Sequence, residues 1–324
     1  MATIEVLSPG IQTTVQDYPG RVGHLASGYY PAGPMDHYSH RLANALVGND
    51  PGAATLEITL GKIGLRFSDT VDIAVTGAKA DVSVNGEPVA HSAVVTVPAG
   101  GELRVGGASD TGFRLYLAVA GGIDIPAVLG SRATYTMGQL GGVEGRALRK
   151  GDVLPIGGDD GGKRYELAAP LPEHTHEWVL DVTPGPHATP EYLDEQDLET
   201  LFATPWQVDR NANRTGVRLE ARRLKWARAS GGIAGGHPSN ILDNGYPLGG
   251  INLNGDTPVI LAPDGPTAGG FVVVAVVCHA SLWKLGQLRP GTDTVRLNLI
   301  TIEQAQARAE ELDRSIAESL KEIS

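Results

Sequence analysis

One glycine-rich stretch gathers the side chains of this chain that are best suited to chemistry. It covers residues 231–244, GGIAGGHPSNILDN, and it has neither helical nor strand periodicity, so we predict a loop. Its polar side chains are His237, Ser239, Asn240, Asp243 and Asn244. Glycine lets a backbone approach a ligand closely, and these side chains can hold a small polar molecule by hydrogen bonds. A turn whose Asn and Asp side chains bond only their own backbone explains the composition equally well.

Other loops carry more hydrogen-bonding side chains than a plain connection needs. The loop-rich region 121–145 and the residue after it are the clearest case, and a second group lies between two strands at 283–287. The candidate site residues outside the glycine-rich loop are Tyr30, Arg132, Gln139, Arg146, Lys225, Lys284 and Gln287. For Lys225, a surface position beside Trp226 is an equally good interpretation. Tyr30 is more typical of a pocket wall than of an acid.

Two further motifs suggest other chemistry, but the residues around them do not support it. Residues 157–163, GGDDGGK, have the spacing of a phosphate-binding loop, but Arg164 stands where Ser or Thr is needed and no helix is expected to follow. His174 and His176 have no third ligand at a recognisable spacing, so we predict a solvated linker and no metal site.

Composition limits the classes of function. The chain has 324 residues, enough for two domains or one large β domain, and its 43 glycines and 21 prolines indicate a turn-rich, mainly β protein. The formal charge of −11 argues against a nucleic-acid partner, since phosphate binding needs a basic surface. The densest basic run, residues 218–228, alternates with apolar residues and is more typical of a strand edge.

Cysteine use and the N-terminal sequence bear on location. The single cysteine, Cys278, follows an apolar run, so we predict a small buried side chain and no disulfide within the chain. The first ten residues lack the basic and apolar regions of a signal peptide, and no apolar run is long enough to span a membrane. We therefore expect a cytoplasmic protein with no membrane association.

The first half of the chain predicts a β unit with one helix. After the loop 29–35, Asp36 is a good N-cap for a helix that runs to about residue 47 and closes at Gly48. Residues 54–105 predict antiparallel strands, with Asn85-Gly86 as a two-residue hairpin turn. A nearly continuous apolar strand follows at 113–120, and the change in composition at 157–172 indicates a domain boundary.

The second half predicts a further β unit. Thr189-Pro190 should start a helix that ends near Ala203, and the polar segment 262–270 should leave Asp264 exposed. Apolar residues from Ile302 to Leu320 recur at helical spacing. We expect a mainly β fold with a few short helices: one β unit over 1–160, another over 161–300, and a C-terminal helix over 301–324.

Several separate motifs resemble one family of enzyme subunits. They are TTVQDYPGRVG, GPMDHYSHRLANALVGN, LAVAGGIDIPAVLGSRATYTMGQLGG, NRTGVRLE, KWARASGGIAGGHPSNILDN, PVILAPDGPTAGGF and LWKLGQLRPGT. They resemble subunit 2 of the allophanate hydrolase-type carboxyltransferases. This family includes the carboxyltransferase domain of urea carboxylase and the C subunit of 5-oxoprolinase. The resemblance covers about residues 4–300, and in the second half it is stronger to the urea carboxylase branch.

The resemblance implies two cyclophilin-like β-barrel units and a site completed by a partner, subunit 1. It implies carboxybiotin on a separate carrier as carboxyl donor to a urea or amide nitrogen, with ATP used only by partner subunits such as a biotin carboxylase. The chain has no biotinyl-lysine motif of the Ala-Met-Lys-Met type and no serine-amidase signature. An enzyme component that is active only with subunit 1 is therefore expected.

That chemistry gives the candidate residues provisional roles. Negative charge on the biotin ureido oxygen needs donors, for which the candidates are Lys225, Lys284, Arg132 and Arg146. The weakly nucleophilic nitrogen needs orienting groups, for which the candidates are Asn240, Asn244, Gln139 and Gln287. A proton acceptor is needed as well, and His237, Asp243 or biotin's own nitrogen can fill that role.

Two other functions stay open at this point. The 5-oxoprolinase branch implies ATP-coupled opening of a lactam. A regulatory branch implies a binding role alongside a partner that inhibits a kinase. An intact polar loop at 231–244 favours catalysis or ligand binding over pure regulation.

Overall fold

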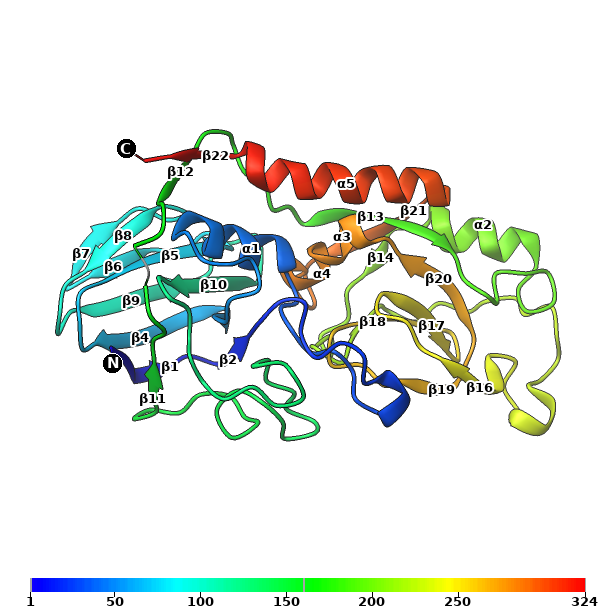
Figure 1. Cartoon of the computed structure of the whole chain (residues 1–324). Coiled ribbons are helices and arrows are strands. Elements are labelled where there is room, and N and C mark those ends of the chain that lie inside the picture. Colours follow the sequence, from blue (N-terminus) through cyan, green and yellow to red (C-terminus); the bar gives the residue numbers. More distant parts are fainter. Residues whose placement is uncertain (1, 160, 324) are drawn as a thin grey trace. The chain divides into compact units, whose positions relative to one another are not determined.

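The computed structural model describes residues 2–159 and 161–323 as a mainly β protein with a few short helices (Figure 1). The chain forms two compact units, and neither is one continuous stretch. Unit 1 comprises residues 1–22, 31–174 and 313–324, and unit 2 comprises residues 23–30 and 175–312. The divisions predicted at residues 160 and 300 stay predictions. Asp160, part of the GGDDGGK motif, lies outside the described residues.

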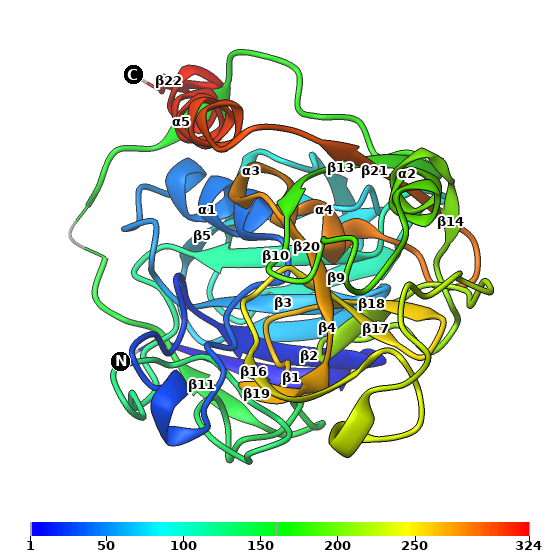
Figure 2. The same ribbon diagram turned by 90° about the vertical axis from the view of Figure 1, so that its right-hand side faces the viewer.

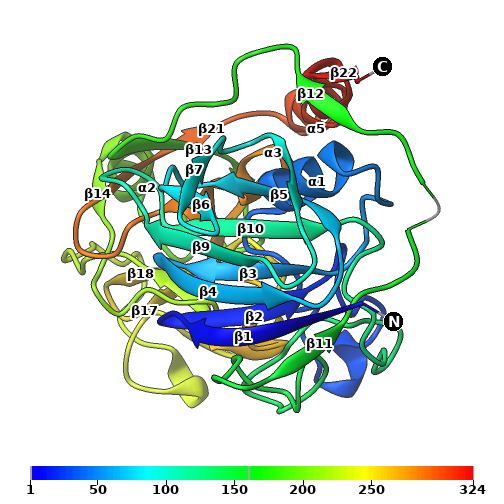
Figure 3. The same ribbon diagram turned by 90° about the vertical axis from the view of Figure 1, so that its left-hand side faces the viewer.

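Unit 1 contains two antiparallel sheets (Figure 3). The six-stranded sheet has the order β11-β1-β4-β9-β6-β7 and the five-stranded sheet the order β2-β3-β10-β5-β8. The bounds are β1 Thr3–Pro9, β2 Gln12–Gln16, β3 Thr55–Thr59, β4 Gly61–Phe67, β5 Val71–Gly77, β6 Val82–Val84, β7 Glu87–Val89, β8 Val94–Val97, β9 Glu102–Gly107, β10 Arg114–Val119 and β11 Val153–Pro155. Aliphatic side chains from both sheets form one core cluster, which explains why the strands are rich in Val, Ile and Leu.

Two local predictions for unit 1 are confirmed. Helix α1, His37–Leu46, begins where Asp36 accepts a hydrogen bond from the Ser39 amide at 2.8 Å, and Gly48 follows its end with φ +74°. The β6–β7 hairpin turns at Asn85 and Gly86, whose φ values of +52° and +87° suit a two-residue primed turn.

Unit 2 is built on a seven-stranded sheet of order β14-β21-β13-β20-β17-β18-β15 (Figure 2). A separate two-stranded ribbon, β16-β19, accompanies it. The bounds are β13 Glu177–Pro184, β14 Trp206–Gln207, β15 Gly216–Arg218, β16 Asn240–Gly245, β17 Gly250–Asn254, β18 Thr257–Leu261, β19 Ala268–Phe271, β20 Val273–Val277 and β21 Thr294–Leu299. The short helical turns are η1 Leu25–Ser27, η2 Gly232–Ala234, α3 His279–Leu282 and α4 Lys284–Gln287.

The helix predicted from Thr189-Pro190 begins later than expected. Helix α2 spans Glu195–Ala203, and its N-cap is Asp194, whose side chain accepts a hydrogen bond from the Asp197 amide at 2.8 Å. The residues before it are held in another conformation, because Leu193 forms a β-bridge with Trp226. Tertiary pairing therefore overrides the local start signal.

The C-terminal segment is also only partly helical. Helix α5 spans Ile302–Glu318, as its apolar spacing predicts, but it does not continue to the end. Strand β22, Leu320–Glu322, follows and pairs antiparallel with β12, Tyr165–Leu167. A three-residue strand carries too little sequence pattern to be predicted. No helix of the described residues is long and apolar enough to span a membrane.

Candidate functional site

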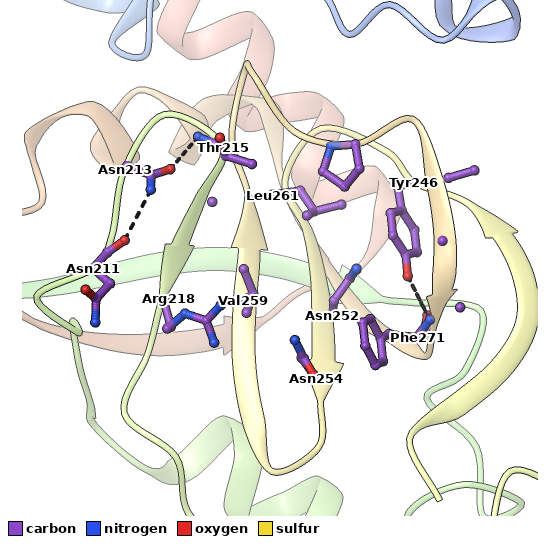
Figure 4. Close-up of a pocket in the computed structure, with 15 residues that line it drawn as sticks. Asn211, Asn213, Thr215, Arg218, Tyr246, Asn252, Asn254, Val259, Leu261 and Phe271 are labelled. Carbon is purple, nitrogen blue, oxygen red and sulfur yellow. Dashed lines mark hydrogen bonds between the residues drawn. The ribbon is translucent and has the colours of Figure 1, made fainter. Parts of the chain in front are cut away.

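A pocket of about 320 Å³ opens within unit 2 (Figure 4). It lies over one face of the seven-stranded sheet, between the loop that precedes β15 and the strand β19. The lining residues are Asn211, Asn213, Thr215, Gly216, Arg218, Tyr246, Asn252, Asn254, Val259, Leu261, Pro266, Ala268, Gly269, Gly270 and Phe271. Apolar side chains and amides thus share the surface, as is typical of small-molecule sites.

Strand register places the floor residues side by side. Val259 of β18 pairs with Asn252 of β17 on one side and with Arg218 of β15 on the other. Paired residues of adjacent strands point to the same face of a sheet, so these three side chains form one row. Leu261 lies two residues along β18 and pairs with Gly216, which has no side chain and leaves room above the sheet.

One wall is a loop that is rigid through its own hydrogen bonds. Asn211 donates to Asp209. Asn213 donates to the Asn211 carbonyl at 3.3 Å, and the Thr215 amide donates to Asn213 Oδ1 at 2.8 Å (Figure 4). The asparagines therefore serve local turns first. The hydrogen bond from the Asn211 backbone amide, and then that from the Asn211 side chain, hold the pKa of Asp209 below its usual range.

A buried ion pair ties this wall to the segment before β19. The Arg214 guanidinium donates to both oxygens of Asp264, at 2.9 and 2.8 Å, and both side chains are nearly inaccessible to water. The prediction that Asp264 is exposed was wrong, since it is 2% exposed. Flanking Pro and Gly favoured a surface turn, but an arginine fifty residues earlier in the chain supplies the partner that burial requires.

The opposite wall is β19, which packs closely on Tyr246. The Tyr246 hydroxyl accepts a hydrogen bond from the Phe271 amide at 2.7 Å. A Cβ on Gly269 would lie 2.7 Å from the Tyr246 ring, and a Cβ on Gly270 would lie 2.9 Å from the Ile241 carbonyl oxygen. Glycine is required at both positions because the strand is held between the tyrosine ring and β16.

The electrostatics of the pocket are uneven. Arg218 is the only formally charged residue among the described residues that line it. No hydrogen bond or ion pair of the described chain engages its guanidinium, but its charge helps to lower the pKa of Asp209. Asn252 is 4% exposed, and its Oδ1 has no hydrogen-bond partner among the described residues. A buried acceptor without a donor is costly, so Asn252 is a destabilising polar group within the sheet.

The glycine-rich loop 231–244 forms the layer behind the β19 wall. Ser239 is fully buried, its carbonyl accepts the Val272 amide at 3.0 Å, and its hydroxyl accepts the Gly255 amide at 3.1 Å. His237 Nδ1 lies 2.8 Å from the Ser239 hydroxyl, and its ring packs edge-on against Trp226. These contacts join the loop to Val272, between β19 and β20, and to Gly255, in the turn between β17 and β18.

The prediction of a loop was wrong for residues 240–244, which belong to strand β16 and pair with β19, because pairing with a strand distant in sequence gave them an extended conformation. Asn240 pairs with Phe271 and Asn244 with Gly269, with a bulge between them. Asp243 lies in the bulge, is exposed, and accepts the Asn244 amide at 3.0 Å. None of the described pocket-lining residues comes from 231–244. Residues 231–244 therefore lie beside the pocket and support its β19 wall.

Four further candidates lie elsewhere in unit 2. Tyr30 is 1% exposed, donates to the Tyr246 carbonyl at 3.4 Å, and burial raises its pKa well above the ordinary value. Lys225 is exposed and donates to Gln196 at 3.3 Å. Lys284 donates to the Val179 carbonyl at 2.7 Å, and burial lowers its pKa, while Gln287 is fully buried.

The remaining three candidates belong to unit 1. Arg132 donates to the Ile125 carbonyl at 2.7 Å and pairs with Asp124. Gln139 and Arg146 line a hollow of about 390 Å³ in the loop-rich region. Hydrogen bonds to Asp152 raise the pKa of Arg146, which is therefore held as a cation.

Sequence reasoning missed the residues that line the unit 2 pocket. The basic run 218–228 groups Arg218 with several strand-edge arginines, although it also lies within NRTGVRLE. Asn252 is a polar residue inside an apolar strand, which was the available signal. Tyr246 carried no sequence signal of a pocket residue, because its role depends on strands that are distant in sequence.

Comparison with known proteins agrees with this architecture. A family model described as carboxyltransferase domain, subdomain A and B, matches residues 27–299. Urea amidolyase of Lachancea kluyveri is 45% identical over 96% of this chain but only 18% of its own length. The C subunit of 5-oxoprolinase from Escherichia coli K12 is 34% identical, over 89% of this chain and 88% of that protein. The crystal structure of the K. lactis urea amidolyase superposes with a TM-score of 0.93 at 44% identity, covering 99% of this chain and 20% of that one.

Proposed function

Because this chain belongs to the carboxyltransferase family of subdomains A and B, we propose that it forms part of a carboxyltransferase site for urea or a related small amide. In this proposal it acts as subunit 2 and is active only with subunit 1, as a separate or fused chain. The urea amidolyase relatives are far longer than the chain, so the other activities would reside on other polypeptide segments. We further propose that each β unit is a cyclophilin-like barrel.

The observation that carries the proposal is the unit 2 pocket with Asn252 at its floor. A urea or primary amide is small, planar and polar, and the pocket lining offers it the amide side chains of Asn252 and Asn254 beside the cation of Arg218. Val259, Leu261 and Phe271 give the pocket apolar faces on which a planar group can pack. Orienting a weak nucleophile in this way supports attack on an activated carboxyl group.

The pocket also suits a group in which negative charge develops. Carboxybiotin, carried by another chain, would supply the carboxyl group that is transferred. Arg218 is the charged donor of this pocket, and a guanidinium stabilises developing negative charge more strongly where water is displaced. The donor set fits a ureido oxygen or a carboxylate, and ATP would be used only by the partner subunits.

The residues singled out in the sequence remain part of the proposal. The proposed catalytic groups are His237, Lys225, Asp243 and Lys284. The proposed substrate-orienting groups are Ser239, Asn240, Asn244, Tyr30, Gln287, Arg132, Gln139 and Arg146. For Ser239, Asn240 and Asn244 the contacts favour an indirect role, in which they fix the β19 wall of the pocket.

The test combines the full chain with subunit 1, a biotin carboxylase and a biotinylated carrier, and measures phosphate release from ATP. We expect urea-dependent release that requires the carrier, and at least about a tenfold fall in its rate with Asn252→Leu, because the acceptor is lost. Circular dichroism and co-purification with subunit 1 control for folding. Urea turnover that is unchanged in the variant would remove Asn252 from the site.

The second candidate is the C subunit of a 5-oxoprolinase. The observation that favours it is length: the chain matches 88% of the Escherichia coli protein, whereas it matches 18% of the urea amidolyase. Turnover of 5-oxoproline that needs no biotinylated carrier would support this candidate over the first. Absence of turnover with either substrate would contradict both.

A further inference from the structure

We infer that His187 is a positioning residue for the β19 wall of the unit 2 pocket, and that protonation of its imidazole breaks the hydrogen bond by which it holds this wall. The inference goes beyond the proposed function, because it concerns the wall itself and holds for any ligand of the pocket.

The wall is attached to the main sheet at one point of the chain. Strand β19 belongs to the two-stranded ribbon and ends at Phe271, whereas β20 belongs to the seven-stranded sheet and begins at Val273 (Figure 1). Phe271 lines the pocket, and only Val272 separates it from β20. A shift of Val273 would therefore be passed directly to the pocket wall.

His187 holds Val273 from the side of β13. Its backbone amide donates to the Val273 carbonyl at 3.0 Å, and its ring Nδ1 accepts the Val273 amide at 2.9 Å. The regular ladder between β13 and β20 ends at Pro184, which pairs with Ala275. A Cβ on Gly185 would lie 2.5 Å from the Val273 carbonyl oxygen, so the two segments approach closely there. Beyond that point the imidazole nitrogen takes the place of a backbone carbonyl as the acceptor.

The Val273 amide needs this acceptor because the residue is fully buried. The two amides before it have acceptors of their own. The Val272 amide donates to the Ser239 carbonyl at 3.0 Å, and the Phe271 amide donates to the Tyr246 hydroxyl at 2.7 Å. Loss of the imidazole acceptor would leave a buried donor unpaired, which is costly.

The direction of this hydrogen bond fixes the protonation state of the ring. A backbone amide can only donate, so Nδ1 carries a lone pair and the neutral ring has its hydrogen on Nε2. Protonation places a hydrogen on Nδ1 that points at the Val273 N–H. Burial is the main cause that lowers the pKa of His187, the charge of Arg228 lowers it further, and Glu191 opposes them. The bond is therefore intact at neutral pH and is lost as the pH falls below about 6.5.

A second contact extends the effect of protonation to the other strand of the ribbon. His187 packs edge-on against Tyr192 with ring centroids 5.0 Å apart, and the Arg228 guanidinium lies over the Tyr192 ring at 4.4 Å. Arg228 donates to the carbonyls of Pro238 and Asn240, at 2.8 and 2.6 Å, and Asn240 belongs to β16, which pairs with β19. An imidazolium would repel this guanidinium, so β19 would lose support both at β20 and through β16.

The test is amide hydrogen exchange of the full ¹⁵N-labelled chain, followed by NMR between about pH 7.5 and 4.5. Protection factors are compared, because they remove the intrinsic pH dependence of exchange. We expect the protection of the Val273 amide to fall at least about fivefold more over this range than that of Leu180, a buried residue of β13. The ring signals of His187 should show Nδ1 as an acceptor at neutral pH and as a donor at acid pH.

Two variants separate the acceptor from the charge. His187→Gln cannot take up the proton, and its amide oxygen can accept the Val273 amide, so protection should be kept and its pH dependence should disappear. His187→Phe keeps a ring beside Tyr192 but has no acceptor, so Val273 should be weakly protected at every pH. His24→Gln, which removes a partly exposed histidine of the same unit, is the matched control and should keep the pH dependence.

Three results would each overturn the inference. The first is an equal pH dependence of Val273 protection in His187→Gln and the unaltered chain. The second is a hydrogen on Nδ1 of His187 at neutral pH. The third is a Val273 amide that is as well protected in His187→Phe as in the unaltered chain at neutral pH.

Discussion

Arg214 and Arg218 lie four residues apart but differ in environment. The Arg214 side chain is 5% exposed and bound by both oxygens of Asp264, whereas Arg218 lines the pocket and no hydrogen bond or ion pair of the described chain engages its guanidinium. Burial without a counter-charge would be very costly for Arg214. The first arginine is therefore structural, and the second lines the pocket, where its charge acts on Asp209.

This difference leads to a prediction for Asp264→Ala. Removal of the carboxylate leaves the buried Arg214 charge without its counter-ion, so we expect the free energy of unfolding to fall by about 3–5 kcal/mol. Urea denaturation measures the change. Asp124→Ala, which removes the more exposed partner of Arg132, is the control and should cost about 0–1 kcal/mol. Equal losses in the two variants would contradict the structural role of Asp264.

His40 illustrates a second effect of burial. It is fully buried in α1, where loss of solvation, opposed in part by Glu57, lowers its pKa to about 3. The Asn44 amide lies 3.3 Å from Nε2, and Asn49 donates to Asn44 Oδ1, which fixes the Asn44 nitrogen as the donor. The ring therefore accepts a hydrogen bond at Nε2 and is neutral in the folded chain.

A pH dependence follows from this neutral ring. In the unfolded chain His40 titrates near pH 6.5, whereas the folded chain resists protonation until about pH 3. The contribution of neutral His40 to the free energy of unfolding is therefore fully present above about pH 6.5. It is lost as the pH falls from about 6.5 towards 3, by up to about 1.4 kcal/mol per pH unit. We expect His40→Gln to flatten the decline in the free energy of unfolding between about pH 6.5 and 5.

The measurement is urea denaturation at several pH values in that range. His24→Gln is the control, because no side-chain hydrogen bond of the described residues engages His24 and its loss should leave the slope unchanged. A slope that is the same in His40→Gln and the unaltered chain would show that His40 does not cause the acid sensitivity.

At the scale of elements, the pocket depends on a ribbon outside the main sheet. Strand β19 pairs only with β16 in the described sheets, and Tyr246 holds it through the Phe271 amide. The glycine-rich segment before β16 lets the chain turn tightly enough to reach this position. Residues 231–244 therefore contribute to the pocket by holding β19 in the ribbon, and they do not line it themselves.

The close packing of β19 predicts the effect of Gly269→Ala. The added Cβ would lie 2.7 Å from the Tyr246 ring, so either the strand or the ring must move. We expect a loss of about 1–3 kcal/mol in the free energy of unfolding, measured by urea denaturation. Gly236→Ala is the control, because its Cβ meets no atom within 4 Å and should be tolerated. Unchanged stability in Gly269→Ala would mean that the wall is not held by Tyr246.

At the scale of the whole molecule, the relatives differ in how much of their own length this chain matches. The chain spans about a fifth of the urea amidolyase that it matches, while it covers most of the C subunit of 5-oxoprolinase. In this family the same region occurs both within a longer chain and as a separate subunit. That distribution is consistent with an active site to which other polypeptide segments contribute. The partner and the overall reaction stay proposals for this chain.

This view predicts that the isolated chain is inactive. We expect no turnover of urea or 5-oxoproline by the chain alone, with activity appearing when subunit 1 and the other components are added, since one pocket without a carboxyl donor cannot complete the transfer. Heat-inactivated subunit 1 serves as the control in the phosphate-release assay. Turnover by the isolated chain would contradict the dependence on a partner.

The sequence by itself determined the local features of this protein. Hairpin turns such as Asn85-Gly86, the Asp36 cap and the apolar strands follow from backbone preferences and side-chain periodicity over a few residues, and the motifs identified the family. The tertiary structure decided what depends on distant pairing. It placed Arg218 in one row with Asn252, buried Asp264 against Arg214, and began α2 after the Leu193–Trp226 bridge. Strand register and burial act between residues far apart in the chain, and a single sequence carries no local signal for them.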